Sequence, residues 1–277
     1  MRKVSIIIPT FNRRPMLREA IGSVLAQDFE DFELIVVDDG STDGTADEIK
    51  EYGGRVKLFR HPENRGVSAA RNSGILHTGG KYVALLDSDD LWVKGKLRIQ
   101  ATFLDENPHY PLCYTDEIWI RKGKRVNPMR KHAKYSGWIL EKCLPLCTIS
   151  PSSAMMRRTL FSKVGLFDEA LPVCEDYDFW LRVSARFPVF FIEKKLIIKR
   201  GGHPDQLSHR FWGNDRFRVI ALEKLLSDPS LKPEERESVL KEMQKKCQIL
   251  SQGFFKRGNE SERRRYQEIM RQYGIEI

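Results

Sequence analysis

The chain is organised around Tyr82-Val83-Ala84-Leu85-Leu86-Asp87-Ser88-Asp89-Asp90, where an apolar run typical of a buried strand ends in three carboxylates. Unit charges about 4 Å apart repel by roughly 4 kcal/mol at a partly screened protein site. A fold therefore keeps such a cluster when a cation neutralises it. The nearby ligand atoms are hard oxygens, which favours Mg²⁺ or Mn²⁺ over zinc. A solvated acidic turn that caps the next helix is an equally good interpretation of this stretch alone.

Strands and helices are expected to alternate through the first part of the chain. Strand-like apolar runs occupy residues 4–8, 32–37, 56–59 and 82–86, and helical spacing follows at 15–26 and from 67. This alternation predicts an α/β fold with a mainly parallel sheet flanked by helices. Ligands bind such sheets outside the carboxyl ends of the strands, where Thr10, Asp39 and residues 87–90 fall. We expect these strand ends to meet at one crevice.

Arg71 is an anomaly on the helix that begins near residue 67. It shares the face expected to pack on the sheet with Val67, Ala70 and Gly74. A guanidinium there requires an anion, and in an acidic, metal-binding crevice a ligand phosphate is the expected one. The alternative is an arginine that reaches solvent past a small neighbour.

Beyond residue 91 the alternation becomes irregular, and this half is expected to close over the crevice. A helix is predicted near 94–105, with strands at 112–115, 190–192 and 196–198 and an apolar piece at 153–156. From about 212 the pattern is helical, with Val239, Leu240, Met243, Cys247 and Leu250 on one stripe. These helices serve packing, dimerisation or surface attachment, and the pattern predicts no oligomeric state.

A second candidate site begins near residue 174. Asp176 is placed by helical spacing on one face with Phe179 and Trp180, so an inward carboxylate is expected among aromatic groups. Such an environment suits an acid or base. Glu175 and Asp178 fit better as N-terminal acids that respond to the helix dipole. In the loop 200–208, His203 is a candidate metal ligand, although a lone loop histidine is more often merely exposed.

The net charge is +9, from 47 basic and 38 acidic residues, and much of the excess lies at residues 121–134. This basic segment has seven Lys or Arg and no acidic residue. Such charges repel one another, so we expect a mobile loop until an anion meets it. The expected anion is an acceptor phosphate or carboxylate, or an anionic membrane surface, and a solvated loop is the alternative. The segment contains no aromatic residue, which is evidence against a nucleic-acid-binding role.

Cysteine usage and hydropathy bear on the compartment. The five cysteines lack a CxxC pair, so neither a disulfide framework nor a zinc ribbon is indicated. The chain enters a strand pattern directly, without a signal segment, and no apolar run approaches the roughly 20 residues of a membrane span. We expect a cytoplasmic protein, with any membrane contact made peripherally at the inner face.

Five motifs in order resemble those of the family 2 inverting glycosyltransferases of the GT-A fold. They are residues 4–12 (VSIIIPTFN), 36–45 (VVDDGSTDGT), 64–66 with 70–72 (NRG and ARN), 86–90 (LDSDD) and Glu175-Asp176. The similarity covers residues 1 to about 210. It implies a glycosyltransferase domain at 1–210, with a nucleotide-sugar-binding half at 1–110 and an acceptor-side half at 111–210, and a C-terminal helical extension at 211–277.

The resemblance also implies roles for individual residues. Pro9, Thr10 and Asp39 are similar to the pocket for the nucleotide base and ribose, with Arg71 near the base or phosphates. Asp87-Ser88-Asp89 resembles the DXD element of the family, in which one Asp meets the ribose and another holds Mn²⁺ or Mg²⁺ on the diphosphate. Asp90 would share either task. Asp176 matches the family's general base, and His203 resembles a downstream histidine that approaches metal or phosphate.

The implied reaction moves a sugar, with a UDP-sugar favoured, from a nucleotide-sugar donor to a hydroxyl of a saccharide or lipid-linked acceptor in polysaccharide or glycolipid synthesis. One base is enough for inversion. Two alternatives remain. The basic segment is also typical of a non-catalytic nucleotide-sugar or polyanion-binding protein. A sugar nucleotidyltransferase uses a similar sheet and metal, but a glycine-rich loop is expected where this chain has residues 9–14 (PTFNRR).

Overall fold

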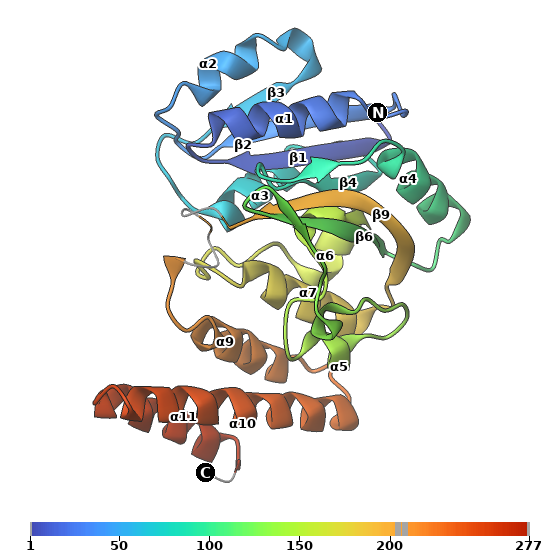
Figure 1. Cartoon of the computed structure of the whole chain (residues 1–277). Coiled ribbons are helices and arrows are strands. Elements are labelled where there is room, and N and C mark those ends of the chain that lie inside the picture. Colours follow the sequence, from blue (N-terminus) through green and yellow to red (C-terminus); the bar gives the residue numbers. More distant parts are fainter. Residues whose placement is uncertain (1, 203–205, 207–209, 276–277) are drawn as a thin grey trace.

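The computed structural model describes residues 2–202, 206 and 210–275 and confirms the predicted alternation of strands and helices (Figure 1). Four parallel strands lie in the order β3-β2-β1-β4. Their bounds are β1 Val4–Thr10, β2 Phe32–Asp38, β3 Lys57–Arg60 and β4 Tyr82–Leu85. Every residue of β1 is buried because helices cover both faces of the sheet, which explains its continuous apolar run.

Alternate residues of β1 point into two separate cores. Val4, Ile6 and Ile8 pack with α1 (Arg14–Leu25) and α4 (Lys96–Glu106), and the short α2 (Thr45–Lys50) adds Ile49 to this core. Ile7 points to the opposite face, where it packs with α3 (Val67–Leu76). The sheet is therefore the middle layer of three.

Gly74 sets the distance between α3 and the sheet. A Cβ atom at this position would lie 2.4 Å from Cγ2 of Ile7, so a larger residue would push the helix away from β1. This close approach places Arg71, one turn earlier on α3, directly against the sheet rather than at its solvent-facing rim.

The second half of the sheet is mixed. The order continues from β4 through β8-β6-β9-β5, with antiparallel pairs except for the parallel pair β6 and β9, and β7 pairs antiparallel with β6. The bounds are β5 Leu91–Trp92, β6 Leu112–Arg121, β7 Lys124–Val126, β8 Ala154–Arg157 and β9 Phe190–Gly201. The two predicted strands 190–192 and 196–198 therefore belong to a single strand, β9. Residues 193–195 are exposed and charged, and they interrupt the apolar pattern without interrupting the strand.

The remaining helices lie mainly on the side of the sheet that carries α3, where some pack on the sheet and others pack on those helices. They are α5 Leu140–Cys143, α6 Leu160–Val164, α7 Glu175–Arg186, α9 Asp215–Leu226, α10 Pro233–Phe255 and α11 Glu260–Gln272, with 3-10 turns η1 Gly53–Arg55, η2 Arg130–His132 and η3 Pro151–Ser153. In Figure 1, α9, α10 and α11 lie on the side of α7 away from β1–β4. The predicted stripe of α10 is buried at Val239, Met243, Cys247 and Leu250, in the same core as α7. The C-terminal helices therefore pack on the rest of the chain through a shared core.

The basic segment 121–134 differs from its prediction. Its first part forms a hairpin of β6 with β7, and η2 follows. The side chain of Lys134 is only 7% exposed, with its Nζ 3.2 Å from Oε1 of Glu117, so the expectation of a segment without a counter-charge is wrong. The counter-charge is Glu117 of β6, which precedes residues 121–134 in the sequence.

Along the described ranges, no helix combines the length and the apolar character that a membrane span requires.

Candidate active site

The carboxyl ends of β1, β2 and β4 bring the predicted site residues to one edge of the sheet. Thr10 pairs in register with Asp38, the backbone N–H of Asp39 donates to the Thr10 carbonyl at 2.9 Å, and that of Leu86 donates to Ile7 at 3.0 Å. Pro9 and Thr10 are buried, and Thr10 Oγ1 has no hydrogen-bond partner among the described residues. A buried hydroxyl without a partner requires an explanation, and a polar ligand atom is one.

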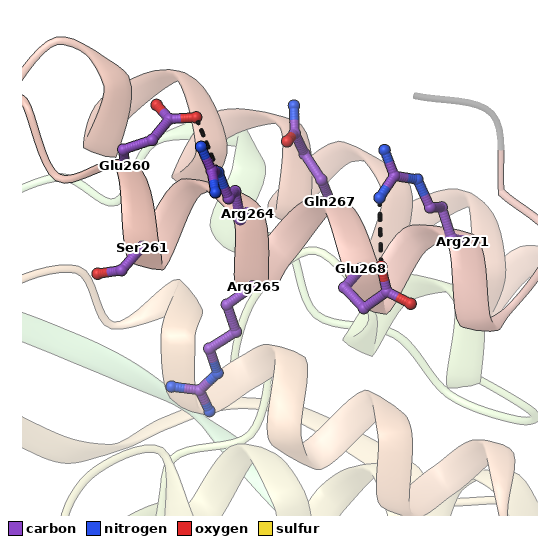
Figure 2. Close-up of a pocket in the computed structure, with 7 residues that line it drawn as sticks. All are labelled: Glu260, Ser261, Arg264, Arg265, Gln267, Glu268 and Arg271. Atoms are coloured by element: carbon purple, nitrogen blue, oxygen red, sulfur yellow. Dashed lines mark hydrogen bonds and ion pairs between the residues drawn. The ribbon is translucent and has the colours of Figure 1, made fainter.

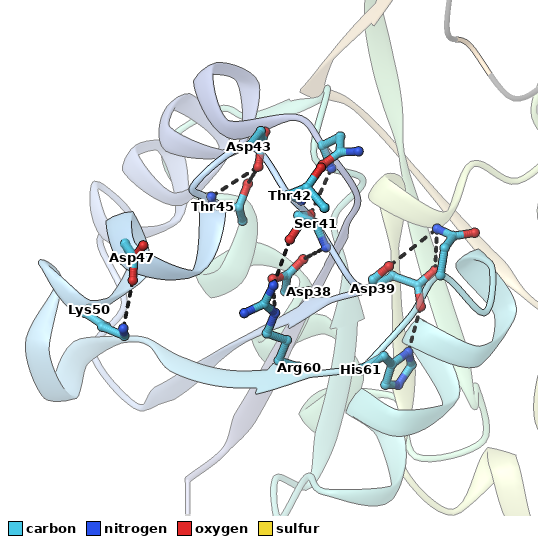
Figure 3. Close-up of polar contacts among 12 residues, drawn as sticks. Asp38, Asp39, Ser41, Thr42, Asp43, Thr45, Asp47, Lys50, Arg60 and His61 are labelled. Atoms are coloured by element: carbon cyan, nitrogen blue, oxygen red, sulfur yellow. Dashed lines mark hydrogen bonds and ion pairs between the residues drawn. The ribbon is translucent and has the colours of Figure 1, made fainter.

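Asp39 organises the loop that follows β3, as Figure 3 shows for its contact with His61. Its Oδ1 accepts from Nδ1 of His61 at 2.6 Å and from the backbone N–H of Arg65 at 3.0 Å. Its Oδ2 accepts from Nδ2 of Asn64 at 2.9 Å and from the backbone N–H of Gly66 at 2.8 Å. An ionised carboxylate has about four acceptor positions, so the chain itself fills them. Asp39 therefore shapes the wall of the site through residues 61–66.

Gly40 permits this loop to close. Its φ is +80°, and a Cβ atom there would lie 2.6 Å from the carbonyl carbon of Glu63. A side chain would thus be strained by the backbone conformation and would also collide with the loop.

The acidic cluster is held by the side chains of two arginines and one serine and by the backbone N–H of a third arginine. Asp87 Oδ1 lies 2.7 Å from Nη2 of Arg71, and Asp89 Oδ2 lies 2.7 Å from Nη1 of Arg13. Asp90 is 2% exposed, and its oxygens accept from the backbone N–H of Arg200 at 3.0 Å and from Ser152 Oγ at 2.7 Å. Asp90 therefore fixes the loop to η3 and β9.

Burial and mutual repulsion disfavour ionisation of Asp89 and Asp90 in this cluster. Burial, and then the charge of Asp87, raises the pKa of Asp89 above its usual range. Burial and the charges of Asp89 and Asp87 raise the pKa of Asp90 well above it. Both shifts show that these carboxylates would be stabilised by a further cation.

Of the predicted metal ligands, Asp89 fits the requirements of Mg²⁺ or Mn²⁺, whereas both oxygens of Asp90 already accept hydrogen bonds from Ser152 and Arg200. Such ions are commonly held by one or two carboxylates, with water and substrate phosphates as the remaining ligands. Within the described part of the chain, no group of three or more His, Cys, Asp or Glu side chains is arranged to hold a metal by itself. His203, the third predicted ligand, lies outside the described residues.

Arg71 links the acidic loop after β4 to the start of α7. It is 3% exposed, and its Nη1 lies 2.6 Å from Glu175 at the start of α7, while Nη2 contacts Asp87. Burial alone lowers the pKa of Arg71, but the charges of Asp87 and Glu175 outweigh this effect and raise it. The alternative of an arginine that reaches solvent is wrong. The anions that satisfy Arg71 in this structure are two carboxylates of the chain.

The orientation of α7 also differs from its prediction. Glu175 and Asp178 are 4% and 1% exposed, and Asp178 pairs with Arg182 and Lys224 at 2.8 and 2.6 Å. Asp176 is only half-buried and lines a cavity. Asp176 is thus directed into a cavity, but it is the least buried of the three acidic residues, which the helical pattern did not predict. Glu175 and Asp178 are buried because α7 packs against the core and also against α9.

Apart from Lys134 of the basic segment, the cavity beside Asp176 contains residues that the sequence patterns did not single out. Its volume is about 140 Å³, and its lining includes Glu117, Lys134, Cys147 and Lys199. The thiol of Cys147 donates to Asp176 Oδ2 at 3.2 Å, which gives the carboxylate a fixed neighbour. No local pattern marks these residues because they come from β6, β9 and two loops.

A second hollow, of about 540 Å³, lies far from this chemistry on α11. Figure 2 shows that its seven lining side chains all belong to that helix, and that Arg264 and Arg271 pair with Glu260 and Glu268. Most of these side chains are exposed. The hollow is an outer helix face with its charges largely paired.

Comparison with known sequences gives matches over most of the chain. The family model described as Glycosyl transferase family 2 matches residues 5–165. An uncharacterized glycosyltransferase of Rickettsia conorii is 38% identical over 197 residues, which are 70% of this chain and 32% of that protein. The Escherichia coli UDP-Glc:alpha-D-GlcNAc-diphosphoundecaprenol beta-1,3-glucosyltransferase WfgD is 32% identical over 187 residues, 65% of this chain and 69% of WfgD. The chain thus spans about a third of the length of the first of these relatives.

Two solved structures have the same fold. A fragment of S. aureus TarS in complex with UDP-GlcNAc superposes with a TM-score of 0.70 at 20% identity, covering 98% of this chain and 92% of the fragment. The mannosyltransferase PcManGT from Pyrobaculum calidifontis, in complex with GDP-Man and Mn²⁺, gives 0.64 at 20% identity over 86% of this chain and 68% of PcManGT. The predicted α/β fold of the GT-A type is confirmed.

Proposed function

Because the chain belongs to glycosyltransferase family 2, we propose that it transfers a sugar from a nucleotide-sugar donor, with a UDP-sugar favoured, to an acceptor hydroxyl with inversion. We place donor binding in residues 1–110 and the acceptor side in 111–210, with 211–277 as a helical extension. The relatives and neighbours that carry UDP-Glc, UDP-GlcNAc or GDP-Man in their names support a nucleotide-sugar donor.

The observation that carries the proposal is the double contact of Arg71. One guanidinium contacts Asp87 at 2.7 Å and Glu175 at 2.6 Å, so the acidic loop after β4 and the start of α7 are held within the span of one side chain. Asp176 follows Glu175 and faces the neighbouring cavity. A donor at the acidic loop and an acceptor in the cavity would therefore meet beside Asp176.

In the proposed reaction, Asp176 takes the proton of the acceptor hydroxyl while that oxygen attacks the anomeric carbon of the donor sugar. The bond from this carbon to the diphosphate oxygen breaks as the new glycosidic bond forms, and the nucleoside diphosphate leaves. Attack from the face opposite the leaving group inverts the configuration.

Charge on the departing diphosphate is the main electrostatic problem of this reaction. A Mg²⁺ or Mn²⁺ ion held by Asp89, with Asp87 on the ribose side, would neutralise part of that charge. Arg13 and Arg71 keep the two carboxylates in place. Thr10 would contact the nucleoside with its unpartnered hydroxyl, and Asp39 would act by holding the loop 61–66.

We propose a saccharide or lipid-linked acceptor, as the acceptor in the name of WfgD suggests. The basic segment 121–134 is near the acceptor cavity, which Lys134 and His132 help to line. It would contact acceptor phosphates or an anionic membrane surface, where each Lys or Arg contributes on the order of 1 kcal/mol. We therefore propose a cytoplasmic location with peripheral contact at the inner face of the membrane.

The test is a panel of UDP-, dTDP- and GDP-sugars, assayed for hydrolysis and for thermal stabilisation in Mn²⁺, Mg²⁺ or EDTA. One nucleotide should raise the melting temperature more with metal than in EDTA, because only the folded state offers the site. Asp89→Asn should remove the metal-dependent part of the shift, and the exposed Asp31→Asn should not.

Equal stabilisation in metal and in EDTA would contradict the metal role. Failure of every nucleotide sugar to be hydrolysed or to donate its sugar would contradict the proposed function as a whole.

A further inference from the structure

The cavity beside Asp176 has the size of a site for one small ring. Its volume of about 140 Å³ is well below the roughly 300 Å³ at the lower end of the range for drug-sized ligands. The walls come from the β6–β7 hairpin, the loop 147–150 and β9. The indole of Trp119 supplies an apolar surface, and the rest of the lining is mainly polar.

The charges of the lining nearly balance. Three carboxylates, Asp116, Glu117 and Asp176, face two ammonium groups, Lys134 and Lys199. Burial, and then the charge of Lys131, lowers the pKa of His132, so its imidazole is neutral at pH 7. Two positive and three negative groups leave the cavity with a net charge of about −1.

Two hydrogen-bonding groups of the cavity lack partners in the part of the chain that the structure describes. Ser150 Oγ is buried and makes no hydrogen bond. The Nζ of Lys199 lies 5.6 Å from the ring centre of Trp119, with no described hydrogen-bond or ion-pair partner. Burial alone lowers the pKa of Lys199, but Glu117 and Asp90 outweigh this effect and raise it, so the group is an ammonium donor. Unpartnered donors in an enclosed site indicate a ligand with acceptor atoms.

We infer that this cavity receives the reacting sugar of the acceptor as a neutral, polyhydroxylated ring and discriminates against sugars that carry a carboxylate or phosphate on that ring. The inference rests on the proposed function. Hydroxyl groups both donate and accept, so they match the carboxylates of Glu117 and Asp176 as well as the donors of Ser150 and Lys199. An anionic ring would add a negative charge to a partly dehydrated site that already has net negative charge, and such like-charge contacts are costly.

The charges of the cavity and of the basic hairpin would bind two different parts of a lipid-linked acceptor. The sugar would enter the cavity, and its phosphates would remain outside, on the exposed basic residues of the hairpin, Lys122, Lys124 and Arg125. The cavity thus determines which sugar reacts, and the basic hairpin would bind the charged part of the acceptor.

The experiment uses the full chain with UDP and Mn²⁺. The probes are the methyl glycosides of glucose, galactose and mannose and of the corresponding uronic acids, titrated by saturation-transfer NMR. At least one neutral glycoside should bind at least tenfold more tightly than its uronic acid, a difference of about 1.4 kcal/mol. Trp119→Ala should weaken binding of that neutral glycoside, which assigns the signal to the cavity.

Asp116→Asn tests the charge argument directly. Asp116 is half-buried in the lining, and this variant brings the net charge to about zero, so the ratio between neutral and acidic probe should fall to about threefold or less. Glu117→Gln should do the same, but it also removes the partner of Lys134, and Asp116→Asn therefore serves if that variant fails to fold. Glu193→Gln is the matched control, because it removes one carboxylate from an exposed position of β9 outside the cavity.

Equal or tighter binding of the uronic acids, or no binding of any neutral glycoside, would overturn the inference. So would an unchanged ratio in Asp116→Asn. Hydrolysis of the nucleotide sugar needs only water as acceptor and is measured on the same samples. If hydrolysis persists while the glycosides behave otherwise, the inference fails and the proposed function stands. If hydrolysis is absent for every donor, the proposed function itself has failed.

Discussion

Lys96 should destabilise the folded protein in a pH-dependent way, and replacing it by Met should reveal this. Its side chain is fully buried between α4 and the sheet, and burial lowers the pKa of Lys96 from 10.5 to about 7. Each pKa unit corresponds to about 1.4 kcal/mol, so the largest possible cost of the ammonium is about 5 kcal/mol. The Nζ donates to Gln100 Oε1 at 2.5 Å and lies 4.1 Å from the ring centre of Trp92, which offsets part of that cost.

The direction of the pH dependence follows from the pKa of Lys96, which is about 7 in the folded chain and 10.5 in the unfolded chain. Below pH 7 the ammonium is charged in both the folded and the unfolded chain, so the folded state bears the full cost. Between pH 7 and 10.5 the folded chain releases the proton and the unfolded chain keeps it, so the cost decreases by about 1.4 kcal/mol per pH unit. Lys96→Met should therefore stabilise the protein by roughly 2–4 kcal/mol at pH 6, and this gain should be about 2–3 kcal/mol smaller at pH 9.

The assay is urea unfolding of wild type and Lys96→Met at pH 6, 7, 8 and 9, with the slopes against urea checked for equality. The exposed Lys94→Met is the matched control and should show no such dependence. A stability gain that is the same at every pH would mean that burial of Lys96 does not disfavour its charge, which would refute the reasoning.

Three further predictions concern packing, ion pairing and the basic segment. Arg71→Met should destabilise the fold by about 3–5 kcal/mol, since Asp87 and Glu175 would be left unpaired, and urea unfolding measures this. Gly74→Ala should lower stability by about 1–3 kcal/mol because its Cβ would meet Ile7, whereas Gly22→Ala in α1 meets open space and should be neutral or stabilising; thermal melting of the pair decides. Replacing Lys122, Lys124, Arg130 and Lys131 by Ser should release the protein from anionic vesicles or raise the acceptor KM with donor affinity unchanged, and survival of both properties would show that the segment is only solvated surface.

The parallel half of the fold could be predicted because its signals are local. β1, β2 and β4 are largely buried, so each appears in the sequence as a mainly apolar run, interrupted only by Ser5 in β1 and Glu33 in β2, that ends in polar residues. The position of those ends at one edge follows from parallel strand direction alone.

The details of the site depended on contacts between distant segments. The carboxylate of Asp39 accepts hydrogen bonds from the loop 61–66, including His61 and Gly66. Gly40 must adopt a positive φ for this loop to pack against the chain at residue 40. The burial of Glu175 and Asp178 was not predicted because a periodic pattern identifies one apolar stripe, whereas α7 is buried on more than one side. Glu117 of β6 pairs with Lys134, which follows the β6–β7 hairpin. Residues 121–134 include no acidic residue, so this segment alone does not predict the pair.

In the proposed reaction Asp176 removes the acceptor proton, while the donor is held by other residues, at the acidic loop after β4. The most direct measurement compares sugar transfer and donor affinity in wild type and Asp176→Asn, with the donor that the nucleotide-sugar panel identifies. Transfer should fall by roughly two to four orders of magnitude while the donor Kd stays within about twofold of wild type. Transfer at a rate comparable to wild type would contradict the claim and would assign the proton transfer to another group.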